Sequence, residues 1–329
     1  MRILIVNTGH LGDVILALSA MRRVRDTFPH ADIALITMEP AAMLARTGGW
    51  FTRVWVMPDL MGYGIYPRKY LQWFATFFRA VGWQPDLAIS FMADPEDQVI
   101  IAATGAKLRV GPLKDHNWIY QRGWMTHPLR AALMPSPRHQ RSHEVADACG
   151  FVDNRSGDAA LSDLKLPQAN IDAAKEFEVG GKRTVCLLVC GSNRRRRWPL
   201  DRYKQLAVEL AKRGDVNLLV VSGPAERDIE AAIKLELADA GLAKHLCRQP
   251  LLTLLALLQR CQLAVTVDSG PGHLAAAAGC ETIYLLPEHK RATFLPPGFH
   301  VHPVCARKVA EIPCDAVSQA CAQVLSRSE

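Results

Sequence analysis

Several common signatures are missing from this chain of 329 residues, and each absence excludes a class of protein. No segment reaches 18 apolar residues without a polar interruption, so a membrane-spanning helix is not expected. The apolar run at residues 1–6 is too short for a signal peptide, and the nine cysteines contain no Cys-x-x-Cys pair. We therefore expect reduced thiols in a cytoplasmic protein rather than disulfides or a zinc site.

Acidic residues are fewer than basic ones. The chain has 32 aspartates and glutamates but 39 lysines and arginines, which gives a net charge of +7. A positive balance favours anionic partners, which include nucleic acid, a phosphorylated glycolipid or a membrane face. The basic residues are spread along the chain and no nucleic-acid-binding motif accompanies them, so nucleic acid is not an expected partner. With 49% hydrophobic residues, the chain is long enough for two domains of ordinary size.

The most informative stretch, residues 265–279, joins an apolar strand pattern to a helix through small and polar residues. Backbone N–H groups in the first turn of a helix have no intrahelical acceptor, and the helix dipole adds a partial positive charge there. Gly270 and Gly272 let a ligand approach the backbone closely, and Ser269 offers a hydroxyl beside them. The stretch is therefore either a phosphate-binding junction or an ordinary strand-to-helix turn of an α/β domain.

A second junction, residues 191–200, holds four consecutive arginines between an apolar strand pattern and a helix that begins near Pro199. In a doubly wound sheet the ligand binds at the carboxyl ends of the strands, which is where Arg194 to Arg197 fall. Arginine also binds phosphate oxygens through two N–H groups at once. We favour phosphate binding over a solvated charged surface for this segment.

The chain opens with a buried-type strand pattern at residues 2–6, a short turn, and an apolar helix from Val14 to about Thr27. The glycines of the turn do not form Gly-x-Gly-x-x-Gly, so a dinucleotide site is only weakly indicated. Asp13 lies in the first turn of this helix, where the dipole stabilises a carboxylate. Its role is either that of a capping charge or that of a base facing a cleft, and a base would need desolvation to raise its pKa.

Strand and helix patterns alternate along both halves of the chain, which predicts an α/β protein. A polar segment without strong periodicity separates the halves at residues 153–167. We predict a first domain at residues 1–155, a second at 168–312, and an amphipathic C-terminal helix within 313–329. The predicted strands are residues 2–6, 33–37, 54–57, 86–90 and 108–111 in the first half, and 184–190, 217–222, 244–247, 263–268 and 282–286 in the second.

Five motifs of this chain occur together in one known family. They are Leu11-Gly12-Asp13-Val14, Gly105-Ala106 with Val110-Gly111, Arg196-Arg197-Trp198-Pro199, Gly223-Pro224-Ala225-Glu226, and Asp268-Ser269-Gly270-Pro271-Gly272-His273-Leu274-Ala275-Ala276-Ala277. With them the chain resembles glycosyltransferase family 9, the ADP-heptose:lipopolysaccharide heptosyltransferases, over nearly its whole length. The resemblance implies the GT-B fold, in which two Rossmann-like domains with parallel sheets face each other across a cleft and a C-terminal helix crosses back onto the first domain.

The resemblance also implies a role for each matching position. Asp13 would be the catalytic base, and Glu226 would lie near the nucleoside. Arg196 stands where the family usually has lysine, which keeps the charge but changes the geometry of the hydrogen-bond donors. The donor diphosphate would be held by Arg196, Asp268, Ser269, Gly270 and His273. Candidates on the acceptor side are His10, Gly12, Arg68 and Lys69.

Aromatic residues are concentrated in one segment, since eleven of the 23 fall between Trp50 and Trp83. Trp73, Tyr63 and Tyr66 lie off the helical stripe in this segment, and we expect these three to contact a lipid-anchored acceptor or the bilayer interface. The residues on the stripe follow helical spacing and are expected to face the core. They are Tyr70, Phe74, Phe77, Phe78 and Val81.

The expected function is inverting transfer of heptose from ADP-heptose to an inner-core lipopolysaccharide acceptor. No Asp-x-Asp pair is present to hold a metal, so arginines and a helix N-terminus would hold the diphosphate without a metal or other cofactor. Expected partners are the nucleotide sugar, an anionic glycolipid acceptor and, by peripheral contact, the inner face of the cytoplasmic membrane.

Two alternatives stay open. Residues 287–302 form a short segment that departs from the usual family sequence, so the same fold could use another nucleotide sugar or a protein acceptor. A catalytically silent nucleotide-sugar-binding scaffold would still need the phosphate site of the second half but not Asp13.

Overall fold

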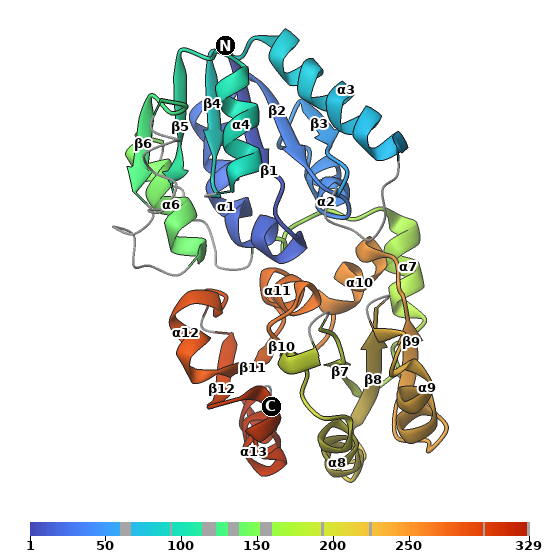
Figure 1. Ribbon diagram of the computed structural model, residues 1–329. Coiled ribbons are helices and arrows are strands. Elements are labelled where there is room, and N and C mark those ends of the chain that lie inside the picture. The colour runs from blue at the N-terminus through green and yellow to red at the C-terminus, as the bar shows by residue number, and fades with distance from the viewer. Residues whose placement is uncertain are drawn as a thin grey trace. The chain divides into compact units, whose positions relative to one another are not determined.

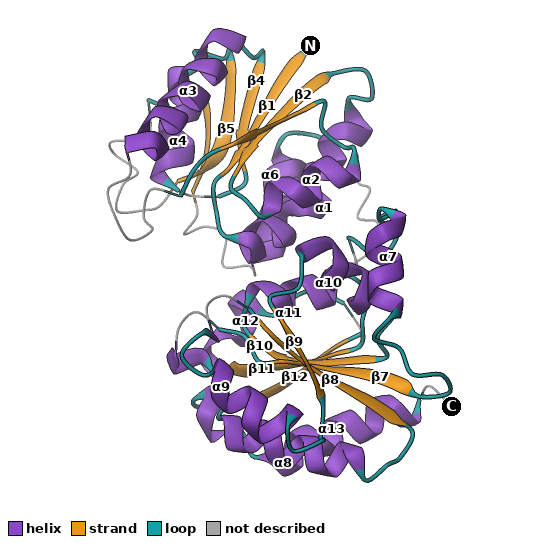
Figure 2. Ribbon diagram, turned by 90° about the vertical axis from the view of Figure 1, so that its right-hand side faces the viewer, coloured by secondary structure: helices purple, strands orange, loops and turns teal. Residues whose placement is uncertain are grey.

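The computed structural model forms two compact units, residues 1–156 and 157–329. The structure describes residues 1–59, 67–92, 94–113, 123–130, 138–151, 160–191, 194–223, 226–298 and 300–327. Each unit is a parallel β-sheet with helices on both faces (Figures 1 and 2). The expected architecture of two Rossmann-like domains is thus confirmed for each unit by itself.

The first sheet has the strand order β3-β2-β1-β4-β5-β6, and all neighbouring strands pair in parallel. The order reverses between β1 and β4, which is the topological switch point where doubly wound sheets bind their ligands. The turns after β1 and β4 therefore lie where a ligand site is expected. The strands are β1 (Arg2–Asn7), β2 (Asp32–Thr37), β3 (Arg53–Val56), β4 (Leu87–Ser90), β5 (Leu108–Leu113) and β6 (His127–Arg130).

The second sheet repeats this topology with the order β12-β11-β10-β7-β8-β9, again with parallel pairing throughout. Its switch point lies between β7 and β10. The four-arginine junction follows β7, and the 268–272 junction follows β10, so the topology brings the two predicted phosphate-binding segments together. The strands are β7 (Arg183–Leu188), β8 (Val216–Ser222), β9 (Lys244–Cys247), β10 (Leu263–Val267), β11 (Thr282–Pro287) and β12 (Val301–Ala306).

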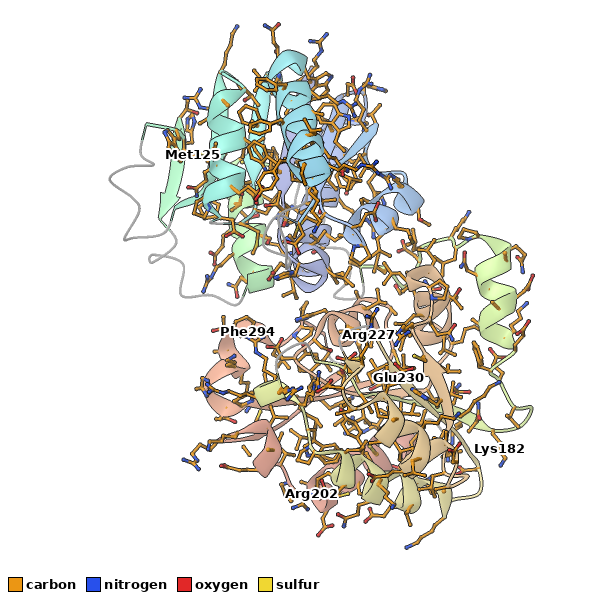
Figure 3. All side chains as sticks on the ribbon, turned by 45° about the vertical axis from the view of Figure 1, so that its right-hand side comes forward. Met125, Lys182, Arg202, Arg227, Glu230 and Phe294 are labelled. Carbon is orange, nitrogen blue, oxygen red and sulfur yellow. The ribbon has the colours of Figure 1, made fainter. Side chains whose placement is uncertain are left out.

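Alternate residues of β1 feed two cores on opposite faces of the first sheet, as the period of a strand requires. Ile3 and Ile5 belong to the core on one face, and Leu4 and Val6 belong to the core on the other, which Met125 helps to fill (Figure 3). Helices α1, α2 and α6 cover the first face, and α3 and α4 cover the second (Figure 2). The helices are α1 (Leu11–Thr27), α2 (Ala41–Gly48), α3 (Pro67–Trp83), α4 (Pro95–Ala103) and α6 (Arg138–Ala148).

Helices also cover both faces of the second sheet, with α8, α9 and α13 on one face and α10, α11 and α12 on the other (Figure 2). Short 3-10 turns at Arg194–Arg196 and Val309–Glu311 and a π-helical turn at Lys234–Ala238 complete this unit. The helices are α7 (Gln168–Lys175), α8 (Leu200–Ala211), α9 (Glu230–Ile233), α10 (Leu251–Leu258), α11 (Gly270–Ala277), α12 (Glu288–Phe294) and α13 (Cys314–Ser326).

The C-terminal helix α13 differs from expectation in where it packs. The predicted amphipathic helix is present, but its apolar face is buried in the core of the second unit, and the prediction that it packs on the first domain is wrong. It contacts α8 and the β10–β12 side of the second sheet, so residues 313–329 belong to that unit. The residues that α13 contributes to this core are Cys314, Val317, Cys321, Val324 and Leu325.

Sequence analysis missed the edge strands β6 and β12, and each contains a proline, Pro128 and Pro303 respectively. Proline is tolerated at a sheet edge because no ladder hydrogen bond is needed on the outer side. The described part of the predicted linker, residues 160–167, also packs on the second unit, where the Leu161 N–H donates to the Ala277 carbonyl. In the described part of the chain, no helix has the length and hydropathy to cross a membrane.

Candidate functional site

Asp13 lies in the first turn of α1, directly after the β1 strand at the switch point of the first sheet. The turn before it is tightly packed, because a Cβ atom on Gly9 would lie 2.9 Å from the Asp13 Cβ. The Gly9 N–H donates to the Asn7 Oδ1 at 3.2 Å, which fixes the backbone before the helix. Asp13 itself is half-buried.

Asp97 is a second carboxylate at the same switch point, and sequence analysis missed it. It lies in the first turn of α4, after β4, and is fully buried. Its Oδ1 accepts from the Thr8 N–H at 3.0 Å and from the Thr8 hydroxyl at 2.5 Å, and its Oδ2 accepts from the Ser90 hydroxyl at 3.2 Å. Asp97 therefore clamps the turn that carries Asp13, and an acidic residue just after Pro95 was the available sequence signal.

Burial raises the pKa of Asp97 to about 7, because desolvation outweighs the hydrogen bonds from Thr8 and Ser90. The unfolded chain loses this proton near the ordinary value of 3.8, so between about pH 4 and 7 the folded protein binds the proton more tightly. The free energy of unfolding therefore falls as the pH rises through this window, by at most about 1.4 kcal/mol per pH unit.

The Asp97→Asn variant should lose this pH dependence, since an asparagine is neutral at every pH. Its Oδ1 could still accept from Thr8, and its Nδ2 could donate to the Ser90 hydroxyl oxygen. We expect the variant to gain stability relative to the natural protein as the pH rises from 5 to 8, measured by urea unfolding. A difference between the two proteins that stays constant over this range would contradict the raised pKa.

The acceptor-side candidates all belong to the first unit and to helix starts. His10 is the exposed residue before α1, and Gly12 is buried in its first turn. Arg68 is exposed in the first turn of α3, while the Lys69 ammonium donates to the Asp59 carbonyl at 3.0 Å. In the parallel sheet, α1 follows the carboxyl end of β1 and α3 follows the carboxyl end of β3, and one strand, β2, lies between those two strands.

The aromatic stripe of α3 agrees with the prediction only in part, because Phe77 packs against the core as expected. Tyr70, Phe74 and Phe78 were expected in the core but are exposed. Trp73 was expected at a lipid interface but packs against the core, where it stacks on Phe77 with ring centroids 5.2 Å apart. The Trp73 indole N–H also donates to Glu96 at 2.5 Å. Tyr63 and Tyr66 lie outside the described residues.

The junction after β10 has the geometry of a helix N-terminus. Ser269 caps α11 by accepting from the Gly272 N–H at 3.2 Å, and Pro271 has no N–H to satisfy. The Gly270 N–H precedes any intrahelical acceptor and is therefore available to an anion. Gly272 is required by packing, because a Cβ atom there would lie 2.7 Å from the Val267 carbonyl oxygen.

Asp268 is the centre of a buried network beside this helix. Its Oδ2 lies 3.2 Å from an Arg196 guanidinium nitrogen, and its Oδ1 lies 3.4 Å from Nε2 of His273. The same Nε2 lies 3.3 Å from the Tyr284 hydroxyl. We assign the hydrogen to Nε2, because a carboxylate can only accept. The network holds Arg196 against the start of α11.

The charged groups around Asp268 determine whether its carboxyl group is protonated. Burial alone would raise the pKa of Asp268, but the hydrogen bond and charge of His273 together with the charges of Arg196 and Lys290 outweigh it and lower that pKa. Asp268 is therefore ionised at neutral pH. The Arg196 side chain remains 41% exposed while paired, so its other N–H groups can reach a ligand.

Two other arginines of this turn pair with a different carboxylate. Arg194 and Arg197 both pair with Asp228, at 3.0 and 2.9 Å, and Arg197 also donates to the Gly191 carbonyl. The next residue, Trp198, is buried and its indole N–H donates to the Ile312 carbonyl at 2.9 Å. The Trp-Pro motif therefore anchors the turn, and it leaves Arg196 directed to Asp268.

Glu226 is buried and braces two loops of the second unit. Its Oε1 accepts from the Gly191 N–H at 2.7 Å and its Oε2 accepts from the Gly223 N–H at 2.9 Å. These loops follow β7 and β8 at the carboxyl edge of the sheet. The predicted donor residues are thus brought together in one unit, whereas Asp13 and the acceptor-side candidates lie in the other. In the part of the chain that the structure describes, no cluster of three or more His, Cys, Asp or Glu side chains could hold a metal.

Known proteins resemble this chain in sequence and in fold. Residues 99–316 match glycosyltransferase family 9 (heptosyltransferase). A curated relative, the lipopolysaccharide core heptosyltransferase OpsX of Haemophilus influenzae, is 25% identical over 128 residues, a match that spans 39% of this chain and only 37% of that protein.

Solved structures resemble the chain over almost its full length. A family 9 glycosyl transferase from Veillonella parvula has a TM-score of 0.82 at 17% identity, covering 99% of this chain and 97% of that one. The E. coli heptosyltransferase WaaC with ADP has a TM-score of 0.79 at 17% identity, covering 98% and 100%. At these identities the structures show the fold alone. The family match covers more than half of the chain, which therefore belongs to glycosyltransferase family 9, the heptosyltransferases.

Proposed function

We propose that this protein transfers heptose from ADP-heptose to a hydroxyl of an inner-core lipopolysaccharide acceptor, with inversion at the anomeric carbon. The observation that carries this proposal is the pairing of Arg196 with Asp268 beside the start of α11. A half-exposed guanidinium and a first-turn N–H that has no intrahelical acceptor together make a site for a diphosphate.

Departure of the nucleotide is the step that this site would assist. When the bond between the anomeric carbon and the diphosphate oxygen breaks, ADP leaves with additional negative charge. Arg196 and the Gly270 N–H are fixed before the reaction, so they stabilise this charge without reorganising. We propose that they do so without a metal ion or other cofactor.

Attack by the acceptor is the step that Asp13 would assist. The acceptor oxygen bonds to the anomeric carbon from the face opposite ADP, and the hydroxyl proton passes to the Asp13 carboxylate. The close approach of Gly9 supports this role, because a glycine there leaves room for the Asp13 side chain at the start of α1. Asp97 would not contact the substrate in this proposal. It would position the turn before Asp13 by accepting hydrogen bonds from Thr8.

The identity of the donor and acceptor is proposed from family membership and from charge. The solved structure of the E. coli heptosyltransferase WaaC is one with ADP, which supports an adenine nucleotide as the leaving group here. Glu226 would then lie near the nucleoside while it braces the loops after β7 and β8. An anionic glycolipid acceptor suits Arg68 and Lys69 on the first unit and the net charge of +7. We place the protein at the inner face of the cytoplasmic membrane, where such an acceptor is presented.

Calorimetric titration with ADP, UDP, GDP and CDP tests the donor site. We expect ADP to bind most tightly, and we expect its affinity to fall in Arg196→Ala but to survive in Asp13→Ala. Preference for UDP or GDP would overturn the ADP-heptose assignment, and absence of nucleotide binding would overturn the donor site. Transfer of heptose to a purified glycolipid acceptor, lost in Asp13→Ala, would then distinguish an enzyme from a silent binding protein.

A further inference from the structure

Helix α3 has an apolar face that is exposed among the residues that the structure describes. Leu71 is 70% exposed, Phe78 64%, Phe74 50% and Tyr70 40%. In the part of the chain that the structure describes, the aromatic residues among the large exposed hydrophobic side chains all lie on this helix. Spacings of three and four residues place the four side chains on one side of the helix, so they form a continuous patch rather than scattered contacts.

The opposite side of α3 already accounts for its attachment to the unit. Thr76 and Ala80 are buried, and the Thr76 hydroxyl donates to the Val56 carbonyl at 3.0 Å. Trp73, Phe77 and Trp83 pack against the core beneath the helix. The exposed patch is therefore not needed to hold the helix in place, and its apolar character calls for another explanation.

The charges on α3 indicate the chemistry of the partner. The helix carries Arg68, Lys69 and Arg79 and no acidic residue. Arg68 and Arg79 are exposed and stand at the two ends of the patch, just before Tyr70 and just after Phe78. An apolar face bordered by basic residues is typical of helices that lie in the interface of an anionic bilayer.

We propose that the exposed face of α3, formed by Tyr70, Leu71, Phe74 and Phe78, docks on an anionic lipid bilayer. The aromatic and leucine side chains enter the boundary between headgroups and acyl chains, and the flanking arginines contact lipid phosphates. A second copy of this chain fits less well, because a symmetric pair of α3 helices would bring three positive charges of each helix against those of the other.

Sedimentation with lipid vesicles tests this surface without donor or acceptor, so its result does not depend on the proposed glycosyl transfer. The protein should bind phosphatidylcholine vesicles that contain phosphatidylglycerol, and binding to pure phosphatidylcholine should be weaker. The double substitution Phe74→Ser and Phe78→Ser should lower the partition coefficient by about tenfold or more. Arg79→Gln should weaken binding to the anionic vesicles and reduce its dependence on salt.

Leu235→Ser is the matched control, because Leu235 is 68% exposed on the second unit and lies outside the patch. This variant should bind vesicles like the natural protein. All substituted residues are exposed, so circular dichroism and the unfolding midpoint should not change. Failure of the natural protein to bind anionic vesicles would overturn the proposal, as would undiminished binding by the double variant. A dimer in analytical ultracentrifugation that the double variant dissolves would assign the face to a second copy instead.

Discussion

Asp13→Asn is expected to lower kcat for heptose transfer by a factor of about 10² to 10⁴, while the affinity for ADP stays within about twofold. Asparagine has nearly the same shape but cannot accept the hydroxyl proton, so only the chemical step should suffer. Rapid-quench assays with saturating donor and acceptor would measure kcat, and calorimetry would measure ADP binding. Because Asp13 and the donor residues lie in different units, the two readouts should separate cleanly.

Asp26→Asn is the matched control for this experiment. Asp26 is an exposed carboxylate on the same helix, so the substitution removes the same charge from α1 without touching its first turn. We expect its kcat to be unchanged within about twofold. The role of Asp13 as a base would be refuted by an Asp13→Asn enzyme that retains most of its rate at saturating substrates, or by one that has lost ADP binding.

Arg196→Ala is expected to lower kcat by a factor of about 10² to 10³ and also to weaken ADP binding. The substitution removes the cation that would stabilise the departing diphosphate and leaves the buried, ionised Asp268 without its arginine partner. Arg196→Lys restores the charge, so it should recover most of the lost activity despite the different geometry of its donors. Steady-state kinetics for the three proteins would measure both effects.

Arg213→Ala controls for the loss of an ion-paired arginine from the second unit. Arg213 pairs with Asp215 just before β8. This pair lies at the amino ends of the strands, whereas Arg196 lies at their carboxyl ends. We expect this variant to keep kcat and ADP affinity, although it removes the same side chain. Equal losses in Arg196→Ala and Arg213→Ala would show that the effect reflects general charge or stability rather than the diphosphate site.

The predicted donor residues came together because the topology of a parallel sheet is simple. Every turn that follows a strand lies at the same edge, so motifs after β7 and β10 become neighbours once those two strands pair. The sequence pattern could indicate Arg196 and Asp268 as site residues, but not that they form an ion pair. It also could not show that His273 is buried against Asp268 and Tyr284, since that contact depends on the packing of α11 on β11.

Asp97 shows why part of the first unit's site was missed. Its partner Thr8 is distant in the sequence and belongs to the turn after β1, while its other partner, Ser90, lies at the end of β4. An acidic residue near a helix start is common and suggests only a favourable interaction with the dipole. Pairing of β1 with β4 is what buries Asp97 against Thr8 and raises its pKa.

Local patterns by themselves determined the two-domain α/β architecture, most strands, and the turns that carry Asp13, Arg196 and Ser269. Tertiary structure alone decided which side of α3 is buried and where α13 packs. Periodicity tells which residues share a face of a helix, but the hydrophobic effect has no direction and does not specify what that face meets. Tyr70 and Phe74 are exposed because Trp73 and Phe77 fill the core instead, a choice that only the docking of α3 on its sheet could make.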